Sequence, residues 1–321
     1  MRFLVTGGAG FLGSALANRL FDDGHEVRVL DDLSNGRQAS LHPGIHFTAG
    51  DVDNVPLLWS LLPDIDCVYH LAARVSVAQS FLHPRDYNRV NVGGTVSLME
   101  AMRDTGVRRV VFTSSGAVYG RQQQQPVHED DQPHLDSPYA VSKWAAEQYI
   151  HTIGDLWGLE TVALRIFNAY GPGQSLPVSH APVVPRFLQQ ALTGGSIVIF
   201  GDGEQSRDFV YLSDVVEALV SAAAAKGVNR MVINVGSGVE TGIAELVDQI
   251  ELVVGRSVNR IVNRSQSGGV PRLVADISRA RMVLGFRPFV NLVEGLRLIL
   301  GEDERFYGRA EERGSRGAGG N

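Results

Sequence analysis

Short apolar runs alternate with amphipathic stretches through the first half of the chain. The apolar runs are typical of buried strands and lie at 3–6, 26–30, 46–48, 67–70, 109–113 and 161–167. Between them, apolar residues recur at helical spacing over 14–23, 56–62, 92–103 and 138–150. Strands that alternate with helices of this length indicate βαβ units, which form a parallel sheet with right-handed crossovers. We therefore predict an α/β fold built on a doubly wound parallel sheet.

The second half of the chain has a different pattern. Loops rich in Gly and Pro flank a predicted helix and a short strand, and these elements favour a smaller mixed α/β domain packed over one end of the sheet. We expect the larger domain to comprise 1–167 and a returning segment at about 208–238. The smaller, substrate-binding domain would comprise 168–207 and 239–307, and a disordered tail would follow at 308–321.

Composition narrows the class of protein. The net charge is −6, from 29 basic and 35 acidic residues, which argues against a nucleic-acid partner and against an anionic membrane surface. Cys67 is the single cysteine, so neither an internal disulfide nor a cysteine-built metal site is possible, and we expect no metal. No run approaches the ~18 apolar residues of a membrane span. We therefore expect a cytoplasmic protein.

A glycine-rich turn follows the first predicted strand. Gly8, Gly10 and Gly13 satisfy the G-x-G-x-x-G spacing, which allows a tight turn, close approach to a pyrophosphate and close helix packing. The phosphates would bind to free N–H groups at the start of the next helix. Asp31 follows Gly13 by 18 residues, where a carboxylate binds the adenosine ribose and repels a 2′-phosphate. The sequence thus predicts a Rossmann-type domain that binds NAD.

A second group of residues indicates proton-transfer chemistry. Ser137 and Pro138 are typical of a helix start, and they place Tyr139 and Lys143 four residues apart on one helical face. A neighbouring ammonium and a positively charged nicotinamide would both favour the phenolate form of the tyrosine. Ser115, after an earlier strand, would hold the substrate oxygen that loses its proton. The alternative is an ordinary amphipathic pair on a helix.

With these motifs the chain resembles the NAD-dependent epimerase/dehydratase branch of the extended short-chain dehydrogenases/reductases. It is most similar to the UDP-glucose (UDP-galactose) 4-epimerases, with the UDP-glucuronate 4-epimerases close behind. The similarity covers roughly residues 1–300. It rests on Thr6–Gly13, Asp31–Gly36, Gly50–Val52, His70–Ala73, the pair Tyr139 and Lys143, and Arg165–Asn168.

The resemblance implies a role for each matching position. Tyr139 would be the catalytic acid/base, Lys143 its modulator and ribose anchor, and Ser115 the partner of the sugar hydroxyl. NAD would be bound by Gly7, Gly10, Phe11, Leu12, Gly13, Asp31, Asp32, Leu33, Ser34, Asn35, Gly36, Asp51, Val52, Leu71, Ala72, Ala73, Asn91, Tyr139, Lys143 and Phe167. The nucleotide sugar would be bound by Ser115, Tyr139, Asn168, Val198, Phe200, Arg207 and Arg272. A homodimer through the helices at 92–103 and 138–150 is also implied.

The residues after Ser115 discriminate among the chemistries of the family. Family dehydratases and decarboxylases carry carboxylates in this loop, whereas the segment 113–120 contains none. Simple hydride chemistry remains, so we expect oxidation of the sugar to a 4-keto form and return of hydrogen to either face. A catalytically silent NAD-binding regulator is the rival from another class, but such proteins typically lose the Tyr or the Lys.

Two departures from the family pattern leave the sugar open. Gln266 stands where the family usually has an arginine that binds the diphosphate, and Arg272 is the candidate replacement. Leu273 stands where strict UDP-glucose enzymes have a bulky aromatic, which favours a roomier pocket. UDP-glucuronate, UDP-N-acetylhexosamines and dTDP-hexoses therefore remain alternatives. Asn168 and Ser175 stand where glucuronate enzymes often have threonine and arginine, so UDP-hexose leads.

Overall fold

The computed structural model describes residues 1–177, 181–265 and 269–306, and a seven-stranded sheet lies at its centre. The strand order is β11-β6-β5-β4-β1-β2-β3, and all neighbours are parallel. The strands are β1 (Arg2–Thr6), β2 (Glu26–Asp31), β3 (His46–Ala49), β4 (Cys67–His70), β5 (Arg109–Ser115), β6 (Glu160–Ile166) and β11 (Met231–Val235). The order reverses between β1 and β4, so the predicted doubly wound Rossmann-type sheet is confirmed.

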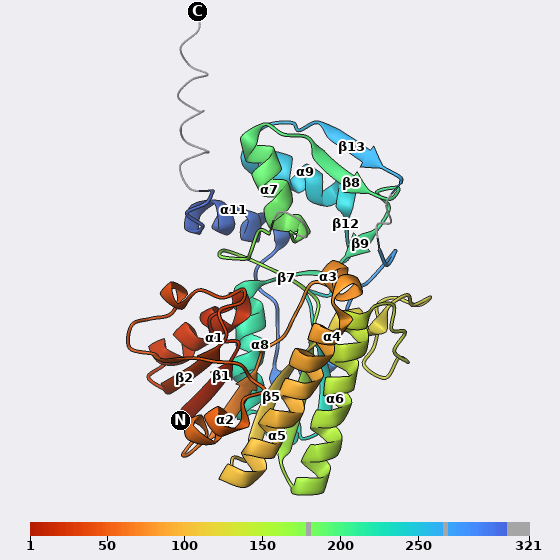
Figure 1. The fold of residues 1–321 in the computed structure, drawn as a ribbon. Coiled ribbons are helices and arrows are strands. Elements are labelled where there is room, and N and C mark those ends of the chain that lie inside the picture. The colour runs from red at the N-terminus through yellow and green to blue at the C-terminus, as the bar shows by residue number, and fades with distance from the viewer. Residues whose placement is uncertain (178–180, 266–268, 307–321) are drawn as a thin grey trace, which may run out of the picture.

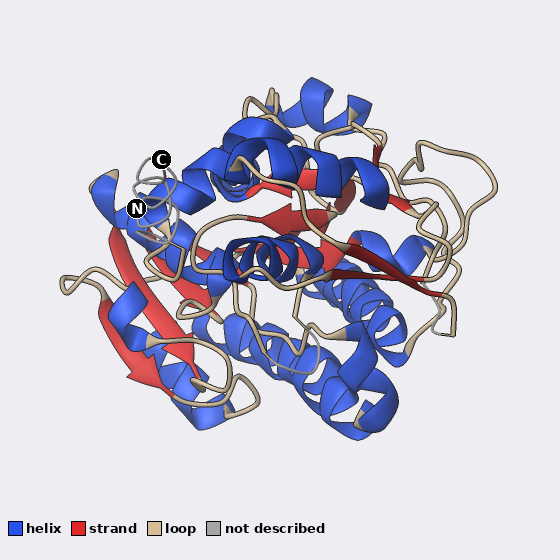
Figure 2. Cartoon of the chain, turned by 90° about the horizontal axis from the view of Figure 1, so that it is seen from above, coloured by secondary structure: helices blue, strands red, loops and turns tan. Residues whose placement is uncertain are grey.

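Helices cover both faces of this sheet (Figures 1 and 2). On one face lie α1 (Phe11–Asp22), α8 (Leu212–Ala224) and α10 (Ser278–Leu284), and on the other α2 (Val55–Leu61), α5 (Gly94–Thr105) and α6 (Pro138–Trp157). Strand β1 shows why its run is apolar throughout. Phe3 and Val5 belong to the core under α1 and α8, while Leu4 belongs to the core under α2, α5 and α6.

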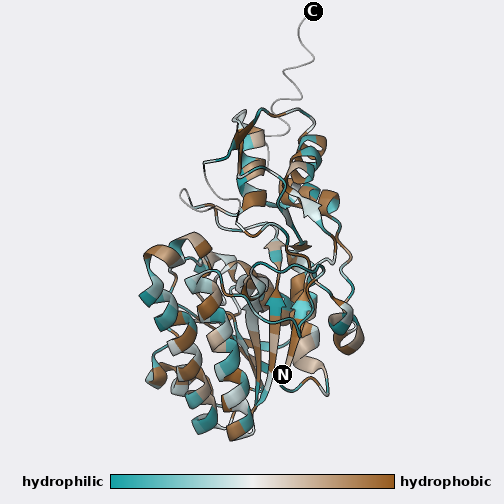
Figure 3. Ribbon diagram, turned by 90° about the vertical axis from the view of Figure 1, so that its right-hand side faces the viewer, coloured by the Kyte–Doolittle hydropathy of each residue, from teal (hydrophilic) through white to brown (hydrophobic). Residues whose placement is uncertain are grey.

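The smaller domain lies over the carboxyl ends of the strands and has its own apolar core (Figure 1). Its helices carry apolar residues on one side and polar residues on the other (Figure 3). Three two-stranded ladders join β10 to β7, β12 to β9 and β13 to β8. The elements are β7 (Asn168–Tyr170), α7 (Val183–Thr193), β8 (Ile197–Phe200), β9 (Ser206–Arg207), β10 (Phe209–Tyr211), β12 (Thr241–Gly242), α9 (Ile243–Val254), β13 (Arg260–Asn263) and α11 (Leu292–Glu302).

Several short elements complete the described chain. They are η1 (Gln38–Ser40), α3 (Val77–Leu82), α4 (Pro84–Tyr87), the π-helix η2 (Asn88–Gly93) and η3 (Gly116–Tyr119). Helix α10 lies within 239–307, the range expected for the smaller domain, and it packs on α8 and β11. The exact domain boundaries stay a prediction, and the predicted tail at 308–321 lies outside the described residues. No helix in the described ranges is long and apolar enough to span a membrane.

Candidate functional site

The glycine turn between β1 and α1 lies at the point where the strand order reverses. Gly7 has φ +69°, and a Cβ there would lie 2.6 Å from the backbone nitrogen of Ala72. At Gly13 a Cβ would overlap the carbonyl oxygen of Gly7. No side chain caps α1 at Gly10, so the N–H groups of its first turn, from Phe11 onward, remain available. This backbone cradle fits an anionic ligand at the positive end of a helix.

Asp31 at the end of β2 holds this turn in place. Its Oδ2 accepts a hydrogen bond from the Ala9 backbone at 2.9 Å, and its Oδ1 accepts one from Leu33 at 2.8 Å. Burial raises the pKa of Asp31, while these backbone hydrogen bonds act in the opposite direction. Gly36 also packs against Ala9, since a Cβ there would lie 2.7 Å from its carbonyl carbon. The predicted ribose loop therefore does lie beside the glycine turn.

The other predicted loop residues occupy different environments. Asp32 accepts a hydrogen bond from the Ser34 backbone at 2.9 Å, and Ser34 and Asn35 lie at the exposed side of the loop. The Asp51 carboxylate pairs with Arg89 at 2.8 Å. Val52 is buried, and a Cβ at Gly94 would overlap its side chain. Asp51 and Val52 thus lie where β3 meets the start of α5, one strand away from β2.

A hydrogen-bonded chain links the end of β4 to α6. The His70 ring lies 2.7 Å from the Thr6 hydroxyl and 2.9 Å from the Thr95 hydroxyl. Burial lowers the pKa of His70 to about 3, so the ring is neutral. Thr95 in turn donates to the carbonyl of Asn91 at 2.6 Å. These hydrogen bonds therefore fix the segment after β4, where Leu71, Ala72 and Ala73 lie.

Asn91 closes the link to the catalytic helix. Its Oδ1 accepts from the backbone of Arg74 at 2.7 Å, and its Nδ2 donates to the Ser142 hydroxyl at 2.9 Å. Ser142 stands between the predicted pair on α6. Nothing in the local sequence spacing indicates Thr95 or Ser142, because both take part only through contacts between elements.

Ser115, Tyr139 and Lys143 come together above the carboxyl end of β5. Ser137 caps α6 by accepting from the Ala140 backbone at 3.1 Å, and this cap fixes the first turn that carries Tyr139. Burial raises the pKa of Tyr139, and hydrogen bonding to the Ser115 side chain acts against that rise. Burial also lowers the pKa of Lys143 to about 7. A phenol and an ammonium with opposed shifts in one buried site are typical of proton-transfer centres.

The groups around Lys143 determine the pKa of its side chain. Its Nζ lies 4.4 Å from the ring centroid of Phe112. One turn further along α6, the buried Glu147 carboxylate raises the pKa of Lys143 against the larger effect of burial. Glu147 also forms a two-bond ion pair with Arg165, at 3.1 and 2.7 Å. The negative charge of Glu147 thus offsets only part of the effect of burial on Lys143.

The predicted substrate residues extend from this centre into the smaller domain. Phe167 is buried and lies against Gly116, where a Cβ would be 3.2 Å from its ring. Leu273 packs in the same apolar cluster as Phe167. Asn168 begins β7 and donates its backbone N–H to the carbonyl of Asp208 at 3.1 Å. Val198 and Phe200 lie on β8, and Arg207 lies on β9.

The Arg272 guanidinium is engaged by a carboxylate of the protein itself. Its guanidinium forms a two-bond ion pair with Glu240, at 2.8 and 2.6 Å, and this pair lowers the pKa of Glu240 to about 2. Two of its donors are therefore already used within the protein. Gln266, whose missing charge Arg272 would replace, lies outside the described residues.

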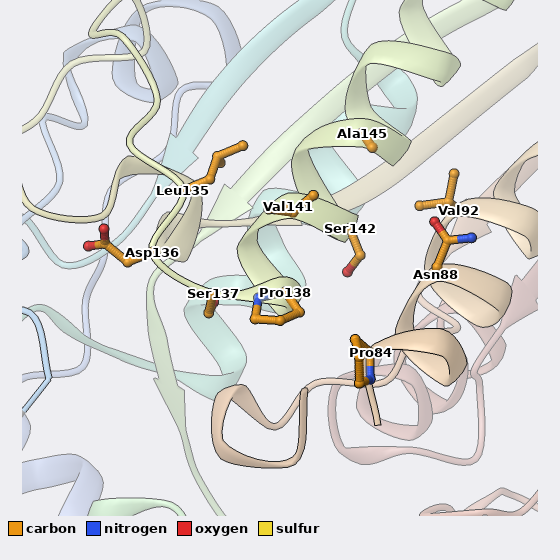
Figure 4. A pocket seen from close by; sticks show the side chains of 10 residues that line it. All are labelled: Pro84, Asn88, Val92, Leu135, Asp136, Ser137, Pro138, Val141, Ser142 and Ala145. Atoms are coloured by element: carbon orange, nitrogen blue, oxygen red, sulfur yellow. The ribbon is translucent and has the colours of Figure 1, made fainter. Parts of the chain in front are cut away.

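A groove of about 460 Å³ lies on the outer side of α6 and is separate from the candidate catalytic residues (Figure 4). Its walls come from α4, η2, α6 and the segment before α6. The lining residues are Pro84, Asn88, Val92, Leu135, Asp136, Ser137, Pro138, Val141, Ser142 and Ala145. Within the described ranges, no cluster of three or more His, Cys, Asp or Glu could hold a metal ion.

Comparison with known proteins adds to this geometry. The family model described as the NAD dependent epimerase/dehydratase family matches residues 3–236. A UDP-glucose 4-epimerase of Mycolicibacterium smegmatis is 42% identical over 305 residues, covering 92% of this chain and 96% of that protein. A UDP-glucuronate 4-epimerase of Thermodesulfobacterium geofontis is 32% identical over 311 residues, covering 92% and 94%. The crystal structure of a Thermotoga maritima UDP-glucose 4-epimerase with UDP-glucose matches with TM-score 0.88 and 34% identity, covering 94% and 98%.

Proposed function

Because the chain belongs to the NAD-dependent epimerase/dehydratase family, we propose that it interconverts UDP-glucose and UDP-galactose by epimerisation at C4. The observation that carries this proposal is the placement of the buried Tyr139 and Lys143 one turn apart on α6, with Tyr139 hydrogen-bonded to the Ser115 side chain at the end of β5. The loop that follows Ser115 supports epimerisation over elimination, because it holds no carboxylate to remove or deliver a second proton.

The residues present fit NAD. The backbone cradle from Gly7 to Gly13 would bind the pyrophosphate, and Asp31 would bind the adenosine ribose. Lys143 would anchor the second ribose beside Tyr139. When bound, NAD supplies the oxidation of C4 and its subsequent reduction. Because each turnover regenerates NAD, protein that retains bound NAD should work without added cofactor.

The protein's own residues move the proton. The Tyr139 phenolate would accept the proton of the C4 hydroxyl, and the Ser115 hydroxyl would hold the same oxygen in place. The Lys143 ammonium would stabilise the phenolate by its charge. After the 4-keto sugar turns in the site, Tyr139 would return the proton to the oxygen. The burial of both side chains excludes water from this transfer.

UDP-glucuronate 4-epimerisation is the second candidate. A relative of that name covers most of the chain, and Leu273 beside Phe167 leaves more room at the sugar than a bulky aromatic would. Ser175 offers no charge for a sugar carboxylate, and for that reason the neutral hexose is preferred.

A homodimer acting in the cytoplasm completes the proposal. Helix α6 exposes Val141, which lines the groove of Figure 4, and Leu156 near its carboxyl end, and these side chains are 47% and 73% accessible. Exposed apolar side chains on this helix support a second copy as its partner. The buried, unpaired Cys67 is consistent with a reducing compartment.

The proposed function predicts turnover without added NAD. We expect the purified protein to convert UDP-glucose to UDP-galactose, followed by proton NMR of the anomeric signals. UDP-glucuronate, UDP-N-acetylglucosamine and dTDP-glucose form the rest of the panel, and the fastest substrate identifies the sugar. If the protein carries NAD and every anomeric signal stays unchanged, the proposal is wrong and a silent NAD-binding role moves ahead.

A further inference from the structure

Arg186 on α7, in the smaller domain, carries a partly buried charge, and no carboxylate of the described residues is paired with it. Burial lowers its pKa. Among the described residues, the arginines whose pKa is raised are instead paired with Asp or Glu. Removing a guanidinium from water costs free energy unless an anion compensates for it. The Arg186 side chain therefore lacks a counter-charge among the described residues.

The Nε of Arg186 is buried and also lacks a hydrogen-bond acceptor among the described residues. The side chain contacts two rings, since the guanidinium carbon lies 5.1 Å from the centroid of Phe187 and 5.2 Å from that of Phe200. Two aromatic rings orient a guanidinium but leave its N–H groups unused. The arrangement fits an anion that the protein does not itself supply.

The position of Arg186 connects it to the nucleotide end of the site. Phe200 ends β8, and the resemblance implies that Phe200 and Arg207 bind the nucleotide and its diphosphate. Gln205, which directly precedes β9, links this strand to Phe200, because its Nε2 donates to the carbonyl of Phe200 at 2.9 Å. The sugar end of the site is formed elsewhere, where Leu273 packs with Phe167.

We propose that Arg186 binds the diphosphate of the nucleotide sugar and supplies the second guanidinium that Gln266 cannot provide. The inference rests on the proposed function. It replaces Arg272 in that role, because Arg272 is already paired with Glu240. A planar guanidinium beside aromatic rings can donate two N–H groups to phosphate oxygens, which is the strong form of this contact.

The test is calorimetric titration of the NAD-containing protein with UDP, beside NMR titration with uridine, which lacks phosphates. We expect Arg186→Gln to weaken UDP binding about tenfold or more and to leave uridine binding unchanged. Arg186→Lys keeps the charge but not the planar arrangement of N–H groups, so its affinity for UDP should lie between those of the wild type and Arg186→Gln. Arg297→Gln removes an exposed arginine of α11 in the same domain and should leave both affinities unchanged.

Each result decides the point. Unchanged UDP affinity in Arg186→Gln, or an equal loss for uridine, would overturn the inference alone. A loss seen with UDP-glucuronate but not with UDP would also overturn it and assign Arg186 to a sugar carboxylate. Wild-type protein that binds no UDP would overturn the proposed function as well.

Discussion

Replacement of Tyr139 by phenylalanine is expected to lower kcat by roughly 10³-fold, because it removes the single oxygen that exchanges a proton with the C4 hydroxyl. The ring itself is buried and packs edge-on against Tyr87, with centroids 6.2 Å apart, so phenylalanine keeps the packing. KM for the nucleotide sugar and the NAD content should change little. The measurement is steady-state epimerisation with UDP-glucose, together with the absorbance spectrum of the bound cofactor.

Tyr149→Phe is the matched control for this prediction. Tyr149 lies on the same helix and is 47% exposed, so loss of its hydroxyl should leave kcat unchanged. Activity of Tyr139→Phe within tenfold of the wild type would show that another group transfers the proton.

Replacement of Lys143 by methionine is expected to have two opposite effects. Activity should fall by roughly 10²-fold or more, because the phenolate loses its stabilising charge. The cofactor-free protein should become more stable near neutral pH, by a few kcal/mol. The reason is that burial lowers the pKa of Lys143 from 10.5 to about 7, so folding disfavours its charged form.

The sign follows from proton binding. Between pH 7 and about 10.5 the unfolded chain binds more protons at this lysine than the folded protein, so its contribution makes stability rise with pH. Below pH 7 the ammonium is charged in both states and the full cost of burying it remains. Denaturant unfolding at several pH values should show this slope in the wild type but not in Lys143→Met.

Lys226→Met provides the comparison, since Lys226 is the only other lysine in the sequence and is exposed. Its stability should follow the wild-type pH dependence. A parallel pH dependence in wild type and Lys143→Met would contradict the account of a lysine held in a costly, poised state.

The fold could be predicted largely from local patterns. Strands such as β4 and β5 are continuous apolar runs because both faces of the sheet are covered, and no other element produces such runs at this spacing. The smaller domain gives weaker signals. β9 and β12 have two residues each, and β13 is mostly exposed, so neither periodicity nor burial indicates them. Their pairing depends on contacts between distant segments.

The candidate site likewise has some features that local sequence predicts and others that depend on contacts between distant segments. The glycine spacing and the Tyr139–Lys143 pair are local, because a turn and a helix fix them within a few residues. The links through Asn91 depend on how η2 packs on α6. Arg272 is engaged by Glu240, 32 positions away, and the Arg186 Nε has no acceptor among the described residues; both are properties of the folded domain. Sequence spacing carries no information about either.

The central claim is that the hydrogen removed from C4 returns to the same carbon within the enzyme. It is tested most directly with UDP-glucose deuterated at C4, incubated with the protein and no added NAD, and followed by NMR and mass spectrometry. The account predicts UDP-galactose that keeps the deuterium at C4, with no loss to water during many turnovers. Product that carries solvent hydrogen at C4, or conversion that requires added NAD in proportion to substrate, would contradict it.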